Sequence, residues 1–295
     1  MRRPWVIILL PLLVCQLGAC AKARGDDFSR HQATEALLGE GAEPRHSLRY
    51  RPLPGRDLVY QLHATRRTEG SGPRARMRLR VALTFPAEGQ STTFALRLLT
   101  LLQLEPEPPA GAPDLGPTHL LLHGSLGPRG TLDRLEEGHE LPSPVNLTLL
   151  APLVFPLYPE SKVGVGGSWQ SSRRFSWSHE LAPDRLIGRM AGFEGRSETL
   201  LERRYTWSRE DKQDDTILAR LEGKAEARLR SSTRTLSHFT RHEGSAKATM
   251  AIAVDRSTGL PETAKISLTG SYDLEASGAK RKVQETLELT LTRER

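Results

Sequence analysis

Strict two-residue alternation between residues 74 and 85 limits the fold of this chain more than any other feature. Successive side chains of a β-strand point to opposite faces of the sheet, whereas an α-helix repeats every 3.6 residues. This stretch therefore predicts a half-buried antiparallel strand. Its two faces are Ala75, Met77, Leu79, Val81, Leu83 and Phe85 on one side and Arg74, Arg76, Arg78 and Arg80 on the other.

The same period recurs along most of the chain and sets the fold class. A turn at residues 255–259 joins two alternating stretches into a hairpin. Residues 216–230 fit both the strand and the helix period, and Gly223 in their middle favours the strand. We predict a mainly β protein, an antiparallel curved sheet or open β-barrel with few short helices. Further strands are predicted over residues 58–65, 91–105, 119–123, 168–178, 199–207, 248–254, 264–274 and 283–291.

Proline and glycine divide this pattern. Residues 105–117 are rich in proline and predict a surface loop, and residues 179–197 predict a loop or short helix. Five prolines interrupt residues 137–159, so we expect extended or edge pieces there rather than helices. The turns at 127–132 and 255–260 occupy similar places in two halves, 57–165 and 166–295, which suggests an internal duplication.

The N-terminus carries a targeting pattern. Arg2 and Arg3 precede an apolar run from Trp5 to Val14, which is too short to span a bilayer as a helix. The run is followed by Leu17, Gly18, Ala19 and Cys20. These four residues resemble the lipobox of bacterial lipoproteins, in which a peptidase recognises the residues before the cysteine and cuts there once its thiol is acylated.

The lipoprotein resemblance implies a domain plan and a location. Residues 1–19 would be a signal peptide, residues 20–56 a lipidated flexible tether, and residues 57–295 a β-rich domain. A short helix is expected over residues 29–38. Cys20 would carry three acyl chains, palmitate among them, and anchor the protein to a membrane of the cell envelope. Because Ala21 rather than aspartate follows the cysteine, the resemblance implies the outer membrane.

The mature chain would keep Cys20 as its single cysteine, since the chain has 2 cysteines and the other, Cys15, lies in the signal peptide. We therefore expect no disulfide. The turn at 255–261 and the glycine-rich approach to a strand at 163–169 look like those of a family of uncharacterised β-rich bacterial lipoproteins. That resemblance implies an envelope protein and no particular chemistry.

Motifs for catalysis are absent from the sequence. It contains no Gly-x-Ser-x-Gly elbow, P-loop or dinucleotide fingerprint, so we expect neither catalysis nor a cofactor. His119 and His123 would lie ~13 Å apart along a strand, too far to share a metal ion. His238 and His242 could share one only on a helix. We therefore expect no metal and, given export, no nucleic acid.

Four arginines form the one surface feature with a direct physical interpretation. Arg74, Arg76, Arg78 and Arg80 would stand ~6.7 Å apart on one face of a strand, able to bind phosphates or carboxylates of lipids or acidic glycans. The alternative is a solvated outer face whose charges are met by neighbouring strands.

These patterns predict a lipid-anchored cell-envelope protein that acts by binding or scaffolding. Its favoured ligand is hydrophobic or anionic, for example an acyl chain held on the concave side of a curved sheet. The sequence does not identify a protein partner. The alternatives are a purely structural envelope component without a ligand, and a hydrolase whose site is not visible in sequence.

Overall fold

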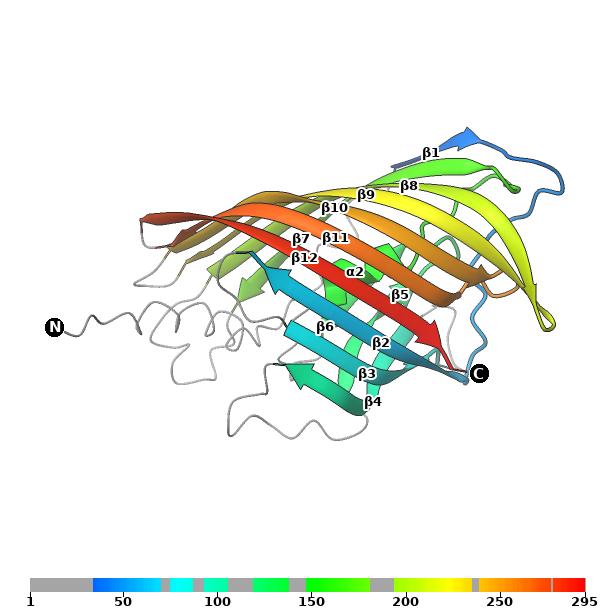
Figure 1. Cartoon of the computed structure of the whole chain (residues 1–295), viewed down its shortest axis with the longest axis horizontal. Helices are drawn as coiled ribbons and strands as arrows, with labels where there is room; N and C mark the ends of the chain where they lie inside the picture. Colours follow the sequence, from blue (N-terminus) through cyan, green and yellow to red (C-terminus); the bar gives the residue numbers. More distant parts are fainter. Residues whose placement is uncertain are drawn as a thin grey trace.

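One antiparallel sheet dominates the computed structural model, which describes residues 34–69, 75–86, 93–105, 119–137, 147–180, 194–234, 239–276 and 278–294. In these ranges twelve strands pair in the order β1-β7-β8-β9-β10-β11-β12-β2-β3-β4-β5-β6 (Figure 1). The strands are β1 (Thr34–Gly39), β2 (Asp57–Thr68), β3 (Ala75–Thr84), β4 (Thr93–Glu105), β5 (Leu120–Leu126), β6 (Leu132–Glu137), β7 (Ser168–Glu180), β8 (Glu194–Gln213), β9 (Thr216–Arg234), β10 (Phe239–Asp255), β11 (Pro261–Ala276) and β12 (Ala279–Arg293).

The predicted fold class is confirmed. The sheet is open, because β1 and β6 end the order without pairing with each other. The alternation of residues 75–84 becomes β3, in which Met77, Leu79 and Val81 are fully buried. The ambiguous stretch 216–230 is strand β9, paired along its length with β8 and β10. Gly223 suits that position because a Cβ there would lie 2.9 Å from the Tyr205 ring.

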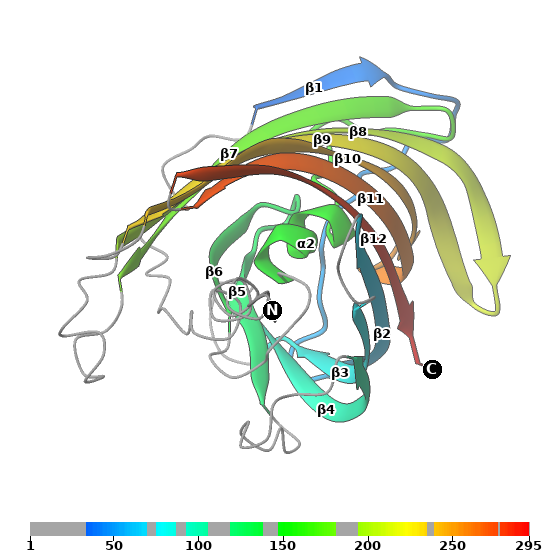
Figure 2. The same cartoon turned by 60° about the vertical axis from the view of Figure 1, so that its left-hand side comes forward.

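The sheet curls around a short helix, α2 (Leu147–Val154), which lies inside the concavity (Figure 2). The prediction of extended or edge pieces for residues 137–159 is therefore wrong for this segment. The helix tolerates Pro152 because it is only 8 residues long, so few of its hydrogen bonds are lost. Its stability comes from burial instead: Leu147, Leu150, Leu153 and Val154 are all buried. It packs against β5, β6 and β11.

The predicted flexible tether is wrong for residues 34–56. Thr34–Gly39 form strand β1, which pairs with β7, so the helix expected over residues 29–38 is also wrong from Thr34 on. Leu48 and Tyr50 are buried, and the Tyr50 ring stacks on Tyr158 with centroids 4.8 Å apart. The mixture of Gly, Pro and charged residues in this segment gave no local signal that Leu48 and Tyr50 would be buried. Residues 1–33, including Cys20, lie outside the described residues.

The proposed halves occupy separate parts of the sheet: strands β2–β6 are contiguous, and so are β7–β12. The turns at 127–132 and 255–260 both contact the segment 49–51. Pro128 O accepts from Tyr50 N, and Thr258 O accepts from Arg51 N, each at 2.7 Å. The internal duplication stays a prediction. The predicted loop at 105–117 lies outside the described residues after Glu105, and β7 and β8 take both ends of the stretch 179–197.

Residues 49–51 pack closely on the turn at 255–260. This packing predicts that alanine substitutions at two glycines differ clearly in their effect on stability. Gly259 has φ +70° and a Cβ there would lie 2.3 Å from Arg49 O, whereas Gly278 has φ +84° with open space around it. We expect Gly278→Ala to lower the free energy of unfolding by about 1 kcal/mol and Gly259→Ala by roughly 3 kcal/mol, because strain and a backbone clash add. Urea denaturation measures both, and equal losses would contradict the packing.

Candidate functional site

The concave face of the sheet is the candidate functional site. Near the turn between β10 and β11 it carries large buried side chains such as Trp207, Leu221 and Ile252. Farther along the strands the side chains become small. Ala227, Ala246 and Gly270 stand opposite one another on β9, β10 and β11, and the two alanines are only half-buried. We call these three residues the small-residue row.

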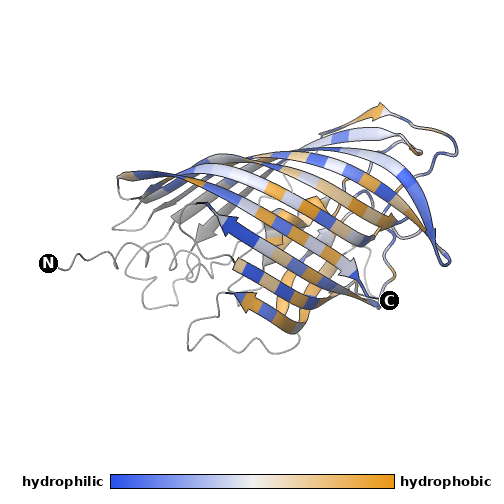
Figure 3. Ribbon diagram, viewed as in Figure 1, coloured by the Kyte–Doolittle hydropathy of each residue, from blue (hydrophilic) through white to orange (hydrophobic). Residues whose placement is uncertain are grey.

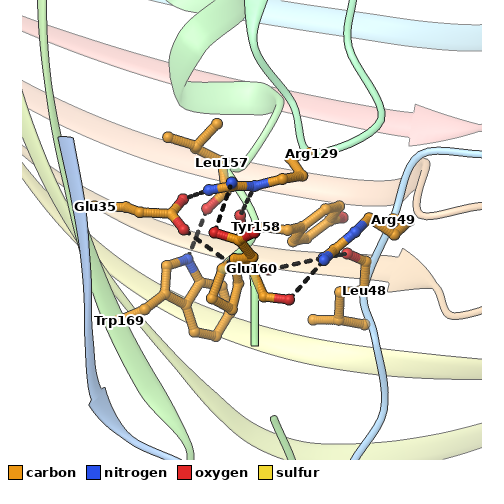
Figure 4. Close-up of polar contacts among 9 residues, drawn as sticks. Glu35, Leu48, Arg49, Arg129, Leu157, Tyr158, Glu160 and Trp169 are labelled. Atoms are coloured by element: carbon orange, nitrogen blue, oxygen red, sulfur yellow. Dashed lines mark hydrogen bonds and ion pairs between the residues drawn. The ribbon is translucent and has the colours of Figure 1, made fainter. Parts of the chain in front are cut away.

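A strap of residues 155–160 follows α2 (Figure 4). It fixes the end of the concavity that lies beside the turn between β10 and β11, which we call the near end. Leu157 O accepts from Trp169 Nε1 of β7 at 2.7 Å, and the Tyr158 hydroxyl donates to Gly259 O at 2.6 Å. Arg49 donates to Pro159 O and to Glu160 O, each at 2.7 Å. The strap therefore connects β7, the turn before β11 and the segment that precedes β2.

Two ion pairs bridge the gap between the edges of the sheet. Arg129, in the turn between β5 and β6, pairs with Glu35 of β1. Arg173 of β7 donates to Asp133 of β6 at 2.9 Å. One edge of the sheet is β1 and β7 and the other is β5 and β6, so these pairs hold together strands that share no backbone hydrogen bonds. Arg173 is only 5% exposed, which makes its partner important for stability.

Arg203 is a second buried guanidinium on the concave face. It is 4% exposed, and its Nη1 donates to Pro152 O in α2 at 2.5 Å. No carboxylate of the described residues lies within 4.0 Å of it. Burial lowers the pKa of Arg173, and the neighbouring charge of Arg203 lowers it further, against the opposing effect of Asp133. The two guanidinium groups are thus close enough to repel each other.

Other polar groups surround Arg203 without hydrogen-bond partners. Ser171 stands directly opposite Arg203 in the pairing of β7 with β8, and Tyr205 follows two residues later on the same face. Within the described part of the chain, four buried polar atoms here have no hydrogen-bond partner: Ser171 Oγ, Thr199 Oγ1, Arg203 Nε and Tyr205 OH. Such atoms are rare in folded proteins, and they are often satisfied by water or a ligand.

A polar cluster lies at the other side of the small-residue row. Arg66 Nε of β2 donates to Glu285 Oε1 of β12 at 2.6 Å, and Gly270 stands opposite Glu285. Tyr272 lies beside them, with its ring centroid 6.1 Å from that of His242. Burial lowers the pKa of His242, so the imidazole is favoured in its neutral form. This cluster contains acid–base groups but no serine or cysteine nucleophile.

Arg74, Arg76, Arg78 and Arg80 are here called the arginine ladder. Polar and apolar residues alternate along β2 and β3 (Figure 3), and Arg78 and Arg80 are exposed while Met77, Leu79 and Val81 are buried, so the ladder lies on the outer face. Neighbouring strands neutralise two of its members: Arg76 lies 3.6 Å from Glu105, and Arg80 lies 2.8 Å from Glu294. Arg78 stands between His63 and Gln103, without a carboxylate among the described residues. Arg74 lies outside the described residues. Anion binding by the ladder stays a prediction, centred now on Arg78.

The histidine pairs are not brought together as ligands. His119 and His123 belong to an extended segment at β5, and His238 lies outside the described residues. Groups of three or more metal-ligating side chains are not found among the residues that the structure describes. Within the same residues, no helix has both the length and the apolar character that a membrane span requires.

Two hollows on the surface of the described residues are not apolar cavities. One of about 440 Å³ is lined by three consecutive residues from each of β1, β7, β8 and β9. Its exposed members Glu202, Arg204, Lys224 and Glu226 alternate with buried Arg203 and Ala225, so it opens on the outer face. Another, of about 380 Å³, has charged walls at the ends of β10–β12. Neither has the Leu and Phe lining expected of an enclosed lipid site.

Comparison of the chain with protein-family models, curated proteins and solved structures gave no match. Functional inference therefore depends on the geometry of the concave face and on the sequence pattern at the N-terminus.

Sequence analysis missed the buried arginines, although their signal was present. The alternation of residues 199–207 places Leu201, Tyr205 and Trp207 on one face, and Arg203 occupies the same face. A charged residue at an inward position of an otherwise apolar strand face is costly unless something compensates it. That conflict marks Arg203 as a candidate without any structure.

Four tyrosines are buried and Tyr272 is half-buried, and this placement predicts the alkaline titration of the protein. Burial is the largest cause of a raised pKa at Tyr50, Tyr60, Tyr158, Tyr205 and Tyr272, which are all 5 tyrosines of the chain. Tyr272 has a pKa of about 12, because the raising effects of burial and Glu285 exceed the lowering effect of Arg66.

Spectrophotometric titration tests this placement. The raised pKa values stabilise the folded chain below about pH 10, and this contribution is lost as the pH rises through about 12. We expect no tyrosinate absorbance step at about pH 10 in the folded chain and a full step there in urea. A step at about pH 10 without denaturant would contradict the burial.

Proposed function

We propose that this chain is a lipid-anchored protein of the cell envelope that binds a hydrophobic or amphipathic ligand on the concave face of its open sheet. The observation that carries the proposal is the small-residue row. An apolar sheet face is stable only when another layer covers it. Helix α2 packs on β5, β6 and β11, whereas Ala227, Ala246 and Leu268 remain half-buried farther along the face.

The open edges of the sheet support the same proposal. A ligand can reach the face of a sheet that is not closed by backbone hydrogen bonds more easily than the interior of a closed barrel. At the near end the strap and the ion pairs of Arg129 and Arg173 hold the curl in shape. A preformed concave surface lowers the entropy lost on binding.

The N-terminal pattern supports the location. If Cys20 is the acylated residue, residues 21–33 separate the lipid from β1. This stretch reaches ~45 Å at most when fully extended. The β domain would therefore work close to the membrane surface, where lipids and lipid-linked molecules are the available ligands.

A ligand-free structural component is the second candidate. It is favoured by α2 and the strap, which fill the near end of the concavity with buried side chains, and by the charged walls of the hollows. The third candidate, a hydrolase, would have to use the cluster of Arg66, Glu285, Tyr272 and His242. That cluster contains neither serine nor cysteine, so its nucleophile would have to be a carboxylate, imidazole or phenol group.

Native purification followed by lipid mass spectrometry separates the first two candidates. We expect at least one lipid species to co-purify in addition to the acyl chains on Cys20, because the half-buried apolar face favours a ligand. The control is the variant Ala246→Trp, whose ring would fill the small-residue row and exclude the lipid. Equal lipid content in wild type and variant, or none in either, would favour the structural component.

Anchoring by Cys20 is tested by changing one thiol at a time. Cys20→Ser should leave the protein unacylated and move it to the aqueous phase in detergent phase separation, because three acyl chains supply the membrane affinity. Cys15→Ser is the matched control and should stay in the detergent phase, since residue 15 would be removed with the signal peptide. Partition of Cys20→Ser with detergent would refute the anchor.

A further inference from the structure

The region around Arg203 has a surplus of hydrogen-bond donors and of positive charge. Two ion pairs between a carboxylate and an arginine lie near it. Glu35 pairs with Arg129, and Asp133 pairs with Arg173, so the nearest acids are already engaged. Arg203 is left with one backbone carbonyl, Pro152 O, and within the described residues it has no ion-pair partner.

One carbonyl does not balance this charge. A helix C-terminus attracts a cation only modestly, and the penalty for burying an unpaired guanidinium is larger. Among the described residues, Arg203 Nε is buried without a hydrogen-bond partner, and so are the hydroxyls of Ser171 and Tyr205 on either side of it. The Arg203 guanidinium is close enough to the Tyr205 hydroxyl to oppose the rise in its pKa that burial causes. An arginine has only donors, and a hydroxyl can donate as well as accept. The missing group is therefore an acceptor, and a negative one satisfies both the charge and the hydrogen bonds.

Apolar surface begins directly beside this donor cluster. Ala225 stands opposite Arg203 on β9, and Ala248 stands opposite Ala225 on β10. Ala227 and Ala246 of the small-residue row lie two residues farther along β9 and β10, at the next position on the same face. A molecule with an anionic head and an acyl tail fits this sequence of surfaces, with its head at β8 and its tail across β9–β11.

We propose that the concave face binds the carboxylate or phosphate head group of an acyl amphiphile, held by the Arg203 guanidinium and the Ser171 and Tyr205 hydroxyls, with the acyl tail on the small-residue row. This proposal rests on the proposed function and specifies its ligand class. Arg203 holds the head group by charge, and the two hydroxyls donate to its oxygens. The tail covers the half-buried alanines of β9 and β10.

Ligand pairs that differ in one property test the head group. Native mass spectrometry of the full-length protein in nonionic detergent would be titrated with palmitate, its methyl ester, lysophosphatidic acid, acetate and inorganic phosphate. We expect palmitate or lysophosphatidic acid to bind, and the uncharged ester to bind about 10- to 100-fold more weakly, which is the range for hydrogen bonds to a charged group. Acetate and phosphate should bind far more weakly still, because they have no tail.

Matched variants test the residues. Arg203→Met keeps the length of the side chain and removes its charge, so palmitate affinity should fall about 10- to 100-fold while the melting temperature without ligand stays level or rises. Arg78→Met, on the outer face, should change neither. Ser171→Ala is the second test of the site if Arg203→Met does not fold, because it removes one donor with little change in volume. It should weaken palmitate binding by about tenfold.

Each contrary outcome points to a different error. Equal affinity for palmitate and its ester, or full palmitate binding by folded Arg203→Met, would overturn the anion site and leave the proposed function standing. Acetate or phosphate binding as tightly as palmitate would overturn the acyl tail. No binding by any acyl compound would overturn both the site and the proposed function, with ordered water satisfying the buried donors.

Discussion

Side chains rather than backbone pairing join the two edges of this open sheet, and the rest of the structure depends on that connection. Arg129 pairs with Glu35 across the opening, and Arg173 pairs with Asp133. The strap of residues 155–160 bonds to Trp169 of β7, to Arg129 O in the turn between β5 and β6, and to the turn before β11, so it connects both edges. Breaking such an ion pair would leave a buried charge without its partner, which is strongly destabilising, so these contacts hold the curl. The curl in turn creates the concave face on which α2 packs.

The connection also explains how the β domain is stabilised without a disulfide, since both cysteines of the chain precede β1. Most of the twelve strands in the described ranges bury one face, and the strap and α2 cover part of that face. Burial at the near end is deep, with Trp169, Tyr158 and Tyr205 fully enclosed. At the small-residue row the side chains are small, and its two alanines are half-buried. The two parts of one surface therefore suit different tasks: the first fixes the shape, and the row leaves room.

Local pattern predicted the strands, and contacts between distant residues decided what it could not predict. The alternation at residues 75–84 identified β3, and Gly223 correctly favoured a strand for β9. Helix α2 was missed because the five prolines of residues 137–159, of which only Pro152 lies in the helix, outweigh its leucines when the local sequence is considered alone. Burial inside the curl decides its conformation instead. Leu48, Tyr50 and the pairs of Arg129 and Arg173 depend on partners about 40 to 110 residues away or more, which no local pattern reveals. Arg203 is different, because its inward position was visible in the sequence.

The central claim is that the concave face holds an amphiphile by its anionic head, and that the site is identified by a buried arginine with no carboxylate partner in the described part of the chain. Lipid anchoring and a concave lipid site fit one another, since the anchor would keep the site near its ligands. The most direct measurement is a crystal structure of the full-length protein with a fatty acid that carries bromine at its tail. The account predicts the carboxylate within hydrogen-bond distance of Arg203 and Ser171 and anomalous scattering from bromine over the small-residue row. Ordered water at Arg203, with bromine elsewhere on the protein or absent, would contradict it.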